Sequence, residues 1–532
     1  MGRFFQSLKY NVLYAIGATA CALMPDFFLR FFPGQTGPIF KLGYLALLAA
    51  FFFCLSLSKS RVYKGVILSF LGILTLIQLS HLAYFGSFMS PMRYRLLLTE
   101  VDEISLSIGG IIHHLWYVIP LSILPWWGAY YLLTRPQCRS LPVLPLLCLF
   151  VLIFVPARLM TRTLEECYPN PKKLSLVNSL HAFFGYFTKV IPAQWNHPLP
   201  TFKPYTVDDL GSPSDRVIVL VMGESCSSQH MGIYGYGRPT TPFLSSLQGD
   251  PHFVAKQGYS AGVATKTSLP MFYGLIREPG NLTALESKTA NLFKLAKQHG
   301  FQTIYISAQK PNLLFGVGAE FIDHVITYDD AVATFEKEKD AALLTLLKTI
   351  PLQKKAFVVL HQRSLHFPYE AGYVNCKACH QYPTKDISYK EYMRNSYDNG
   401  IIFNDYLFQE IFTYFKETVT VPTYLFYASD HGELMGENGR YGHSQLDADV
   451  AKIPFFAYIM RDTPQQFATF QKEEVVTHHE LGLFLAWLLG YTVHNPNATD
   501  HVFFINGNHL AGLEGKIQLT KTSQGVTFQT IK

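Results

Sequence analysis

Long apolar runs near the start of the chain are the feature that most restricts how it can fold. Hydrophobic residues make up 49% of the sequence, an ordinary value for a soluble protein, but the long apolar runs are concentrated before residue 158. Five runs approach the ~20 residues that a ~30 Å hydrocarbon core requires; they lie at residues 10–32, 39–58, 65–86, 111–133 and 141–157. The sequence therefore predicts a membrane domain of five helices over residues 1–157. For the first run, a signal peptide cleaved near "ATA", residues 18–20, is the alternative.

The charges in the short loops between these runs predict how the chain crosses the membrane. Lys and Arg gather in loops 1–9, 59–64 and 134–140, whereas the two alternate loops hold only Arg93 and Arg95. Basic loops stay on the cytoplasmic side, so the N-terminus is expected in the cytoplasm. Five spans then place the rest of the chain on the far side. We expect a multi-pass membrane protein whose C-terminal domain would lie, in a bacterium, in the periplasm or at the cell exterior.

The remainder of the chain has the pattern of a linker followed by a soluble domain. The linker is expected at residues 158–212, which are rich in Pro, Asn, Lys and aromatic residues. Within it "LVNSLHAFFGYFTK", residues 176–189, has an apolar face and few charges, which is typical of an interfacial helix lying on a bilayer. A buried connector helix is the alternative.

Short apolar strands alternate with helical patterns in the soluble domain, residues 213–532. The strands are expected at residues 216–222, 302–307, 356–361, 423–428 and 453–459. Continuous apolar strands alternating with helices indicate a mainly parallel sheet with both faces covered. The tail, residues 516–532, is expected to form a hairpin that turns at residues 523–525.

Acidic and histidine residues follow two of these strands directly. Glu224 comes after the first strand, and "ASDHGE" supplies Asp430, His431 and Glu433 after the fourth. Ligands of open α/β sheets bind beyond the carboxyl ends of the strands, and Glu, Asp and His are all zinc ligands. A surface turn with a cap is the alternative for an Asp–His pair standing alone. The buried strand before the pair and the matching acid Glu224 favour a metal site.

Further histidines and a hydroxyl-rich segment occupy similar positions. His361 and His366 follow the third strand, and His443 lies in "YGHSQ". Histidines on loops at one edge of a sheet are expected to line a polar site, which could bind a metal or an anion such as phosphate. A nucleophile is expected at Ser225 or in "SAGVATKTSLP", residues 260–270. A helix that starts near Thr265 would favour developing negative charge on a hydroxyl there. Thr265, Thr267 and Ser268 are alternatively N-caps, and their spacing does not choose among them.

Several of these segments, in this order, resemble the bacterial phosphoethanolamine transferases, membrane enzymes of the alkaline phosphatase and sulfatase superfamily. The matching stretches are "VMGES…YGYGRPTTP", "AGVATKTSLP", "LHQRSLHFPY", "SDHGELMGENGRYGH" and "THHELGLFLAWLLGY". The resemblance implies a sulfatase-like catalytic domain. It also implies that Glu224, Asp430, His431 and Thr265 bind zinc, with manganese as the alternative, and that Thr265 is the nucleophile.

The resemblance also implies roles for residues around that centre. His366 and His443 match histidines that bind the transferred phosphate, and Glu433 matches an acid near an occasional second zinc. In "ISAQKPN", residues 306–312, an asparagine that relatives use near the substrate is missing. Gln309 and Lys310 are the candidates for its place.

The reaction implied by the resemblance is transfer of phosphoethanolamine from phosphatidylethanolamine to lipopolysaccharide, on lipid A or a core sugar, through a phosphorylated threonine. Membrane lipids are the expected partners, and a monomer is expected. The net charge of +6 is not clustered, so it gives no nucleic-acid signature. A phosphoglycerol transferase of the lipoteichoic acid synthase type is the alternative. "CKACH", residues 376–380, fits c-type haem attachment, but a Cys376–Cys379 disulfide is expected in an oxidising compartment.

Overall fold

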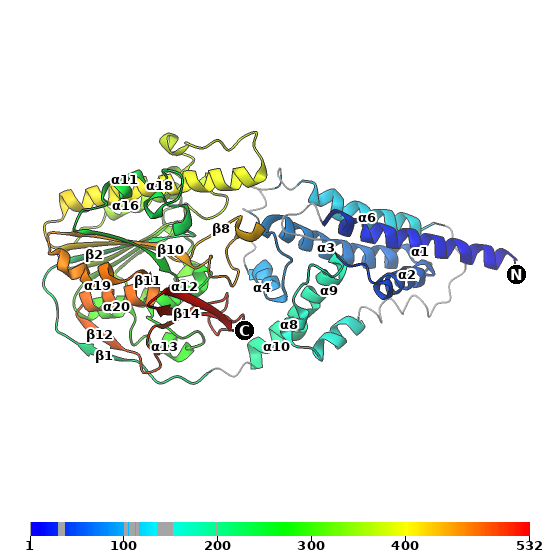
Figure 1. Ribbon diagram of the computed structural model, residues 1–532, viewed down its shortest axis with the longest axis horizontal. Helices are drawn as coiled ribbons and strands as arrows, with labels where there is room; N and C mark the ends of the chain where they lie inside the picture. Colours follow the sequence, from blue (N-terminus) through cyan, green and yellow to red (C-terminus); the bar gives the residue numbers. More distant parts are fainter. Residues whose placement is uncertain are drawn as a thin grey trace. The chain divides into compact units, whose positions relative to one another are not determined.

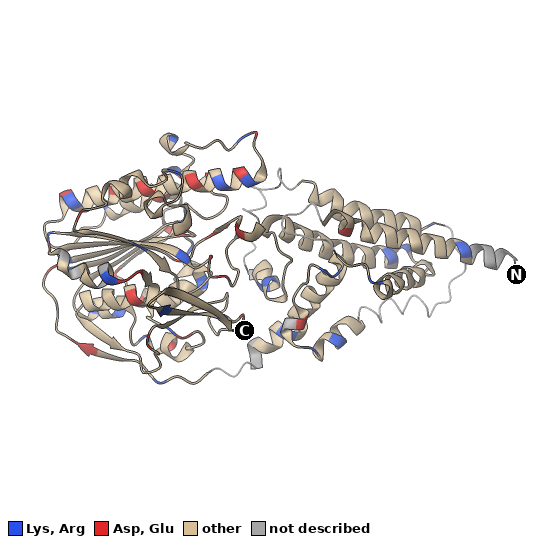
Figure 2. Cartoon of the chain, viewed as in Figure 1, with Lys and Arg blue, Asp and Glu red and all other residues tan. Residues whose placement is uncertain are grey.

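The computed structural model describes residues 2–29, 38–99, 105, 112, 116–135, 153–196 and 200–531. The chain divides into two compact units: a helical unit, Met1–His197 with Gly436–Tyr441, and a sheet unit, Pro198–Met435 with Gly442–Lys532. The boundary at residues 197–198 falls inside the predicted linker. Figure 2 shows that charged side chains are sparse along α1, α3 and α6 and numerous on the sheet unit.

Helices α1, α2, α3 and α6 form the core of the helical unit (Figure 1). The described part of this unit contains α1 (Gly2–Phe28), α2 (Leu42–Ser56), α3 (Arg61–Phe85), α4 (Pro91–Thr99), α6 (Val118–Leu133), α8 (Leu164–Cys167), α9 (Ser175–Gly185) and α10 (Ile191–Asn196), with further helical residues at 153–160 and a π-helix at Tyr186–Val190. Helix α6 packs against α1 and α3. Small residues such as Ala18 and Ala129 are fully buried there, which lets the helices approach closely.

Two helices of the described part are long and apolar enough to cross a membrane, Leu8–Phe28 and Arg61–Phe85. Helices α2 and α6 are apolar but shorter, with 15 and 16 residues. The predicted fifth run, residues 141–157, lies largely outside the described residues. Five spans therefore remain a prediction.

The predicted interfacial segment is helical, as expected, and continues through the π-helix. Helix α9 packs against α3 and α4 and buries Leu176, Asn178, Ser179 and Ala182. That burial favours the connector alternative for this face of the helix. Phe187, in the π-helix, is half-exposed, and contact of this segment with a bilayer stays a prediction.

Reporter fusions test the predicted crossing pattern. Because the basic loops are expected in the cytoplasm, an alkaline phosphatase fused after residue 64 or 139 should be inactive, and one fused after residue 100 or 200 should be active. A fluorescent protein that folds only in the cytoplasm should give the opposite pattern. A fluorescent fusion after residue 200 would contradict both the topology and a periplasmic active site.

An eight-stranded sheet forms the centre of the sheet unit, in the order β11-β3-β10-β7-β2-β6-β4-β5. Its strands are β2 (Val217–Gly223), β3 (Phe253–Tyr259), β4 (Gln302–Ser307), β5 (His324–Ile326), β6 (Ala356–His361), β7 (Thr423–Ser429), β10 (Lys452–Met460) and β11 (Val475–Thr477). All five predicted strands are present. The sheet is mixed, however, because β10 runs antiparallel to both β7 and β3. The segment between β7 and β10 contains no crossover helix, so the chain returns beside β7 in the opposite direction.

Helices cover both faces of this sheet, as predicted. In Figure 1, α18 (Tyr389–Thr418), α11 (Pro242–Ser246) and α16 (Ala342–Leu347) lie on one side, and α19 (Ala468–Lys472) and α20 (His478–Leu488) lie on the other. The remaining α-helices of the unit are α12 (Thr265–Tyr273), α13 (Leu282–Ser287), α14 (Leu292–Gln298), α15 (Val332–Glu338) and α17 (Glu370–Tyr373). Leu220, Phe357 and Phe426 are fully buried in the hydrophobic core that the sheet shares with α12, α14 and α20. Burial of each such large apolar side chain contributes about 1.5–3 kcal/mol to the stability of the folded state.

Smaller sheets flank the central one. Strand β1 (Thr206–Asp209) pairs with β12 (Tyr491–His494), and β13 (Val502–Asn506) pairs with β14 (Lys516–Thr522), which pairs with β15 (Gly525–Ile531). The predicted C-terminal hairpin is therefore confirmed, with Thr522 opposite Gly525 across the turn.

The two cysteines of "CKACH" form a disulfide, as expected for an oxidising compartment. Covalent attachment of haem would need both thiols of Cys376 and Cys379, and the disulfide uses them. The haem alternative is therefore not supported.

Candidate active site

Four neighbouring strands bring the candidate residues to one edge of the sheet. Strands β7, β2, β6 and β4 are adjacent and parallel, so their carboxyl ends meet there. Glu224 follows β2, the Asp430–His431 pair follows β7, and Gln309 lies two residues beyond β4. The sheet order thus gathers residues that are up to about two hundred positions apart in the sequence.

Glu224, Asp430 and His431 form a compact cluster of metal-ligand type. Their ligand atoms lie within 4.8 Å of one another. His431 Nε2 is 3.3 Å from Asp430 Oδ2 and 3.6 Å from Glu224 Oε1. Tetrahedral zinc with bonds of about 2.0–2.1 Å places its ligand atoms roughly 3.3 Å apart, so these separations fit such an ion.

The electrostatics of the cluster also call for a cation. His431 Nδ1 lies 2.9 Å from the Gly432 carbonyl oxygen, which can only accept, so Nδ1 carries a hydrogen and Nε2 is the ring nitrogen that faces the carboxylates. Glu224 and Asp430 are 1% and 0% exposed. Two buried carboxylates that converge on one point repel one another unless a positive charge lies between them. The three residues therefore fit a metal ion.

The Thr265 hydroxyl reaches this cluster from the start of a helix. Thr265 is the first residue of α12, and its Oγ1 donates to Asp430 Oδ2 at 2.6 Å. It lies 3.3 Å from both Glu224 Oε2 and His431 Nε2. The N-cap is Ala264, which has no capping side chain, so Thr265 does not serve as a cap. The hydroxyl thus lies beside all three residues of the cluster, and Thr265 is half-buried.

Ser225, the rival nucleophile, has a different environment. It is fully buried, and its Oγ donates to Glu224 Oε1 at 2.7 Å. Its backbone N–H donates to Asp430 Oδ1, and its φ of 53° turns the chain sharply after β2. Ser225 thus orients two carboxylates, whereas Thr265 faces the open side of the cluster.

Close packing, rather than a positive φ, explains Gly262 in the Thr265 segment. A Cβ at position 262 would lie 2.6 Å from Thr267 Oγ1, which donates to the Ala264 carbonyl oxygen at 2.9 Å. The segment can make its turn into α12 only if this space stays empty.

Gly262→Ala is therefore expected to displace Thr265 and to slow any reaction at its hydroxyl on the order of 10²-fold. Overpacking should also lower the free energy of unfolding by about 1–3 kcal/mol. Gly237→Ala is the matched control, because nothing lies within 4 Å of a Cβ there. Denaturant titrations and transfer assays on both variants check this, and equal behaviour of the two would contradict it.

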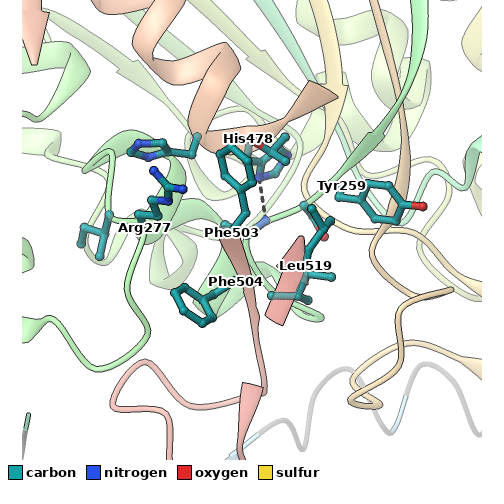
Figure 3. A pocket seen from close by; sticks show the side chains of 12 residues that line it. Tyr259, Arg277, His478, Phe503, Phe504 and Leu519 are labelled. Carbon is teal, nitrogen blue, oxygen red and sulfur yellow. Dashed lines mark hydrogen bonds between the residues drawn. The ribbon is translucent and has the colours of Figure 1, made fainter. Parts of the chain in front are cut away.

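His478 holds the backbone of the segment that leads to Thr265, a role that the sequence did not reveal. Nδ1 accepts from the Ala261 N–H at 3.2 Å (Figure 3), and Nε2–H donates to the Ser429 carbonyl oxygen at 2.8 Å. Burial lowers the pKa of His478 to about 4, so the ring is neutral and can make both bonds. Figure 3 shows it at a small pocket lined by the Phe503 and Tyr259 rings. His478 therefore ties the Thr265 segment to the end of β7.

A second cluster of metal-ligand type adjoins the first. Ligand atoms of His431, Glu433 and His443 also lie within 4.8 Å of one another. Tyr369 donates to Glu433 Oε1, and His443 Nδ1 lies 2.8 Å from Glu433 Oε2. Burial lowers the pKa of His443, but the Glu433 carboxylate more than offsets this and raises it to about 9. His443 is then positively charged near neutral pH.

The other predicted residues occupy the same edge or lie beside it. The His366 ring centroid is 5.9 Å from that of His443, and both residues are half-buried. Gln309 is buried, and its Nε2 donates to Glu224 Oε2 at 2.7 Å. Lys310 is half-buried at the N-cap of the 3₁₀-helix Pro311–Leu314, and its role stays a prediction.

Comparison with known proteins places this arrangement in a family. The sulfatase family profile matches residues 216–491, just over half of the chain. The chain belongs to the sulfatase family. The match includes every predicted site residue and all eight strands of the central sheet.

Relatives of this sulfatase-family chain include named transferases. It is 26% identical over 409 residues to the phosphoethanolamine transferase EptA of Helicobacter pylori, covering 72% of this chain and 74% of that protein. It is 30% identical over 242 residues to the Kdo(2)-lipid A phosphoethanolamine 7''-transferase of Salmonella typhimurium, covering 42% of this chain and 40% of that protein.

A solved structure shares the fold of the sulfatase-family chain. The integral membrane lipooligosaccharide phosphoethanolamine transferase A of Neisseria meningitidis matches with a TM-score of 0.61 at 18% identity. The match covers 91% of this chain and 95% of that protein. The predicted combination of a helical N-terminal region and a sulfatase-like domain is therefore confirmed at the level of fold.

Proposed function

We propose that this chain transfers phosphoethanolamine from phosphatidylethanolamine to a lipopolysaccharide acceptor through a covalent intermediate on Thr265. The observation that carries the proposal is the position of Thr265 Oγ1, at 2.6–3.3 Å from atoms of Glu224, Asp430 and His431. The names of the curated relatives support the transferred group and favour it over phosphoglycerol. The Kdo(2)-lipid A in the name of one relative supports the proposal that the acceptor lies on lipid A or a core sugar.

Glu224, Asp430, His431 and Thr265 would hold one metal ion, for which we propose zinc, with manganese as the alternative. When bound, such an ion lowers the pKa of a ligated hydroxyl and offsets negative charge on a phosphate. The protein contributes the orientation. Asp430 holds the Thr265 hydroxyl, and the start of α12 places backbone N–H groups beside the oxygen that becomes the nucleophile.

In the first half-reaction, Thr265 Oγ1 attacks the phosphorus of phosphatidylethanolamine. The Oγ1–P bond forms as the P–O bond to diacylglycerol breaks, and one proton passes in net terms from the threonine hydroxyl to the diacylglycerol oxygen. In the second half-reaction, the oxygen of an acceptor hydroxyl bonds to the same phosphorus as the Oγ1–P bond breaks, and the proton of that hydroxyl passes in net terms to Thr265 Oγ1. No further reactant is needed.

His443 and His366 are proposed to bind the phosphate during both displacements. Charge builds up on the equatorial oxygens of the phosphoryl group, and donors fixed in advance stabilise it. The positive charge that the Glu433 carboxylate maintains on His443 suits this role. Glu433 is the proposed ligand of an occasional second metal ion, which would bind in place of the proton that lies between Glu433 and His443.

The helical unit is proposed to anchor the chain in the inner membrane by five spans, with the sheet unit in the periplasm. The proposed donor and acceptor are both lipids, so they would have to meet the site at the surface of the membrane. Mass spectrometry of lipopolysaccharide from cells with and without the gene tests the function. Phosphoethanolamine on lipid A or core sugars should be present only with the gene, and its position identifies the acceptor. A phosphoglycerol group, or no difference, would refute the proposal.

A further inference from the structure

The Gln309 side chain is enclosed by partners that fix which end of its amide faces the metal-ligand cluster. Nε2 lies 2.7 Å from Glu224 Oε2 and 3.2 Å from the Gln362 carbonyl oxygen. Both of these oxygens are acceptors, so the NH₂ group must point toward them. Gln309 is 1% exposed, which leaves little room for another orientation.

Arg363 meets the other end of the amide. Its Nη1 donates to Gln309 Oε1 at 2.7 Å, and an arginine can only donate. The backbone at this point is held by Asp340, whose Oδ2 accepts from the N–H groups of Arg363 and Ser364. A guanidinium donor on one side and a carboxylate acceptor on the other therefore select the same orientation of the amide.

From this chain of contacts we infer that Arg363 and Gln309 are positioning residues for the metal ligand Glu224. Arg363 fixes the Gln309 amide, and Gln309 donates a hydrogen bond that holds the Glu224 carboxylate. Outer partners of this kind orient a ligand before the metal arrives, and their loss typically costs 10–100-fold in metal affinity. The inference rests on the proposed function only in taking Glu224 as a metal ligand.

Zinc titration of the full-length, detergent-solubilised protein tests the inference after bound metal has been removed. Arg363→Met and Gln309→Met should each raise the zinc dissociation constant about 10–100-fold. The double variant should be no weaker than the weaker single variant, because both changes interrupt one chain of contacts. Arg363→Lys, which keeps a donor and a positive charge, should recover part of the affinity. Excess zinc should restore phosphoethanolamine transfer by Arg363→Met.

Arg277→Met is the matched control. Arg277 is also half-buried in the sheet unit, but its guanidinium donates to the carbonyl oxygen of Val502. The zinc affinity of Arg277→Met should equal that of the parent. Parent-like zinc affinity in Arg363→Met, or equal weakening in Arg277→Met, would overturn the inference. If Arg363→Met does not fold by circular dichroism, Gln309→Met decides the matter in the same way.

Measuring zinc affinity and phosphoethanolamine transfer separately distinguishes failure of the positioning role from failure of the proposed function. If Arg363→Met loses zinc affinity while the parent transfers no phosphoethanolamine, the positioning role stands and the proposed function falls. If the parent transfers phosphoethanolamine and Arg363→Met binds zinc normally, the proposed function stands and the positioning role falls.

Discussion

Thr265→Ala is expected to abolish phosphoethanolamine transfer while most of the bound metal remains. The substitution removes the oxygen that would carry the phosphoethanolamine but leaves Glu224, Asp430 and His431 as ligands. Loss of a nucleophile typically lowers the rate on the order of 10⁴- to 10⁶-fold. Thr265→Ser keeps the hydroxyl and should retain activity. Transfer from labelled phosphatidylethanolamine, with zinc content measured on the same preparations, checks both expectations.

Ser225→Ala separates the two nucleophile hypotheses. Ser225 donates to Glu224 Oε1, so its loss should weaken the orientation of that ligand and reduce transfer about tenfold without abolishing it. Incubation with phosphatidylethanolamine and no acceptor should add one phosphoethanolamine mass to the peptide that contains Thr265. The same mass on the Ser225 peptide, or near-normal transfer by Thr265→Ala, would move the nucleophile to Ser225.

Local sequence patterns predicted the site because its members lie directly at strand ends or helix starts. The apolar strand before Glu224 and the one before Asp430 were both evident, and the helix starts at Thr265 as expected. Sheet order and strand direction depend on how the connections fold, and apolar runs do not encode them. Strand β10 was therefore predicted without its antiparallel direction.

One strand and two sets of side-chain contacts were not predicted, because they depend on residues that are distant in sequence. Strand β3, "FVAKQGY", has three half-buried residues at its centre and lacks a continuous apolar run. The contact between Gln309 and Glu224 requires β4, β6 and β2 to be neighbours. His478 lies in a quoted motif, but its role depends on the Ala261 and Ser429 backbones, which are distant in sequence.

Removal of Glu224 or His431, unlike removal of the neutral Thr265 hydroxyl, should empty the site without unfolding the sheet. Glu224 and His431 follow different strands, and each lies beyond the hydrogen-bonded part of its strand. Glu224→Ala and His431→Ala should therefore lose most of the bound zinc in metal analysis, while the circular dichroism spectrum stays that of the parent. Unchanged zinc content in both variants would show that the ligand set is wrong.

Asp405→Ala is the control for loss of a buried carboxylate as such. Asp405 is 3% exposed, accepts from the N–H groups of Phe243 and Leu244, and belongs to neither metal-ligand cluster. The Asp405→Ala variant should have a lower melting temperature than the parent and should keep the bound zinc.

Chelation provides a second readout, because a bound ion stabilises the parent by about 2.7 kcal/mol at a free concentration of 100 times its dissociation constant. Stripping the metal also leaves Glu224 and Asp430 facing each other without a cation, which adds to the destabilisation. The chelator should therefore lower the melting temperature of the parent and of Asp405→Ala. Glu224→Ala has lost both the ion and one of the two charges, so its melting temperature should hardly respond. An equal response in all three proteins would mean that the ion binds elsewhere.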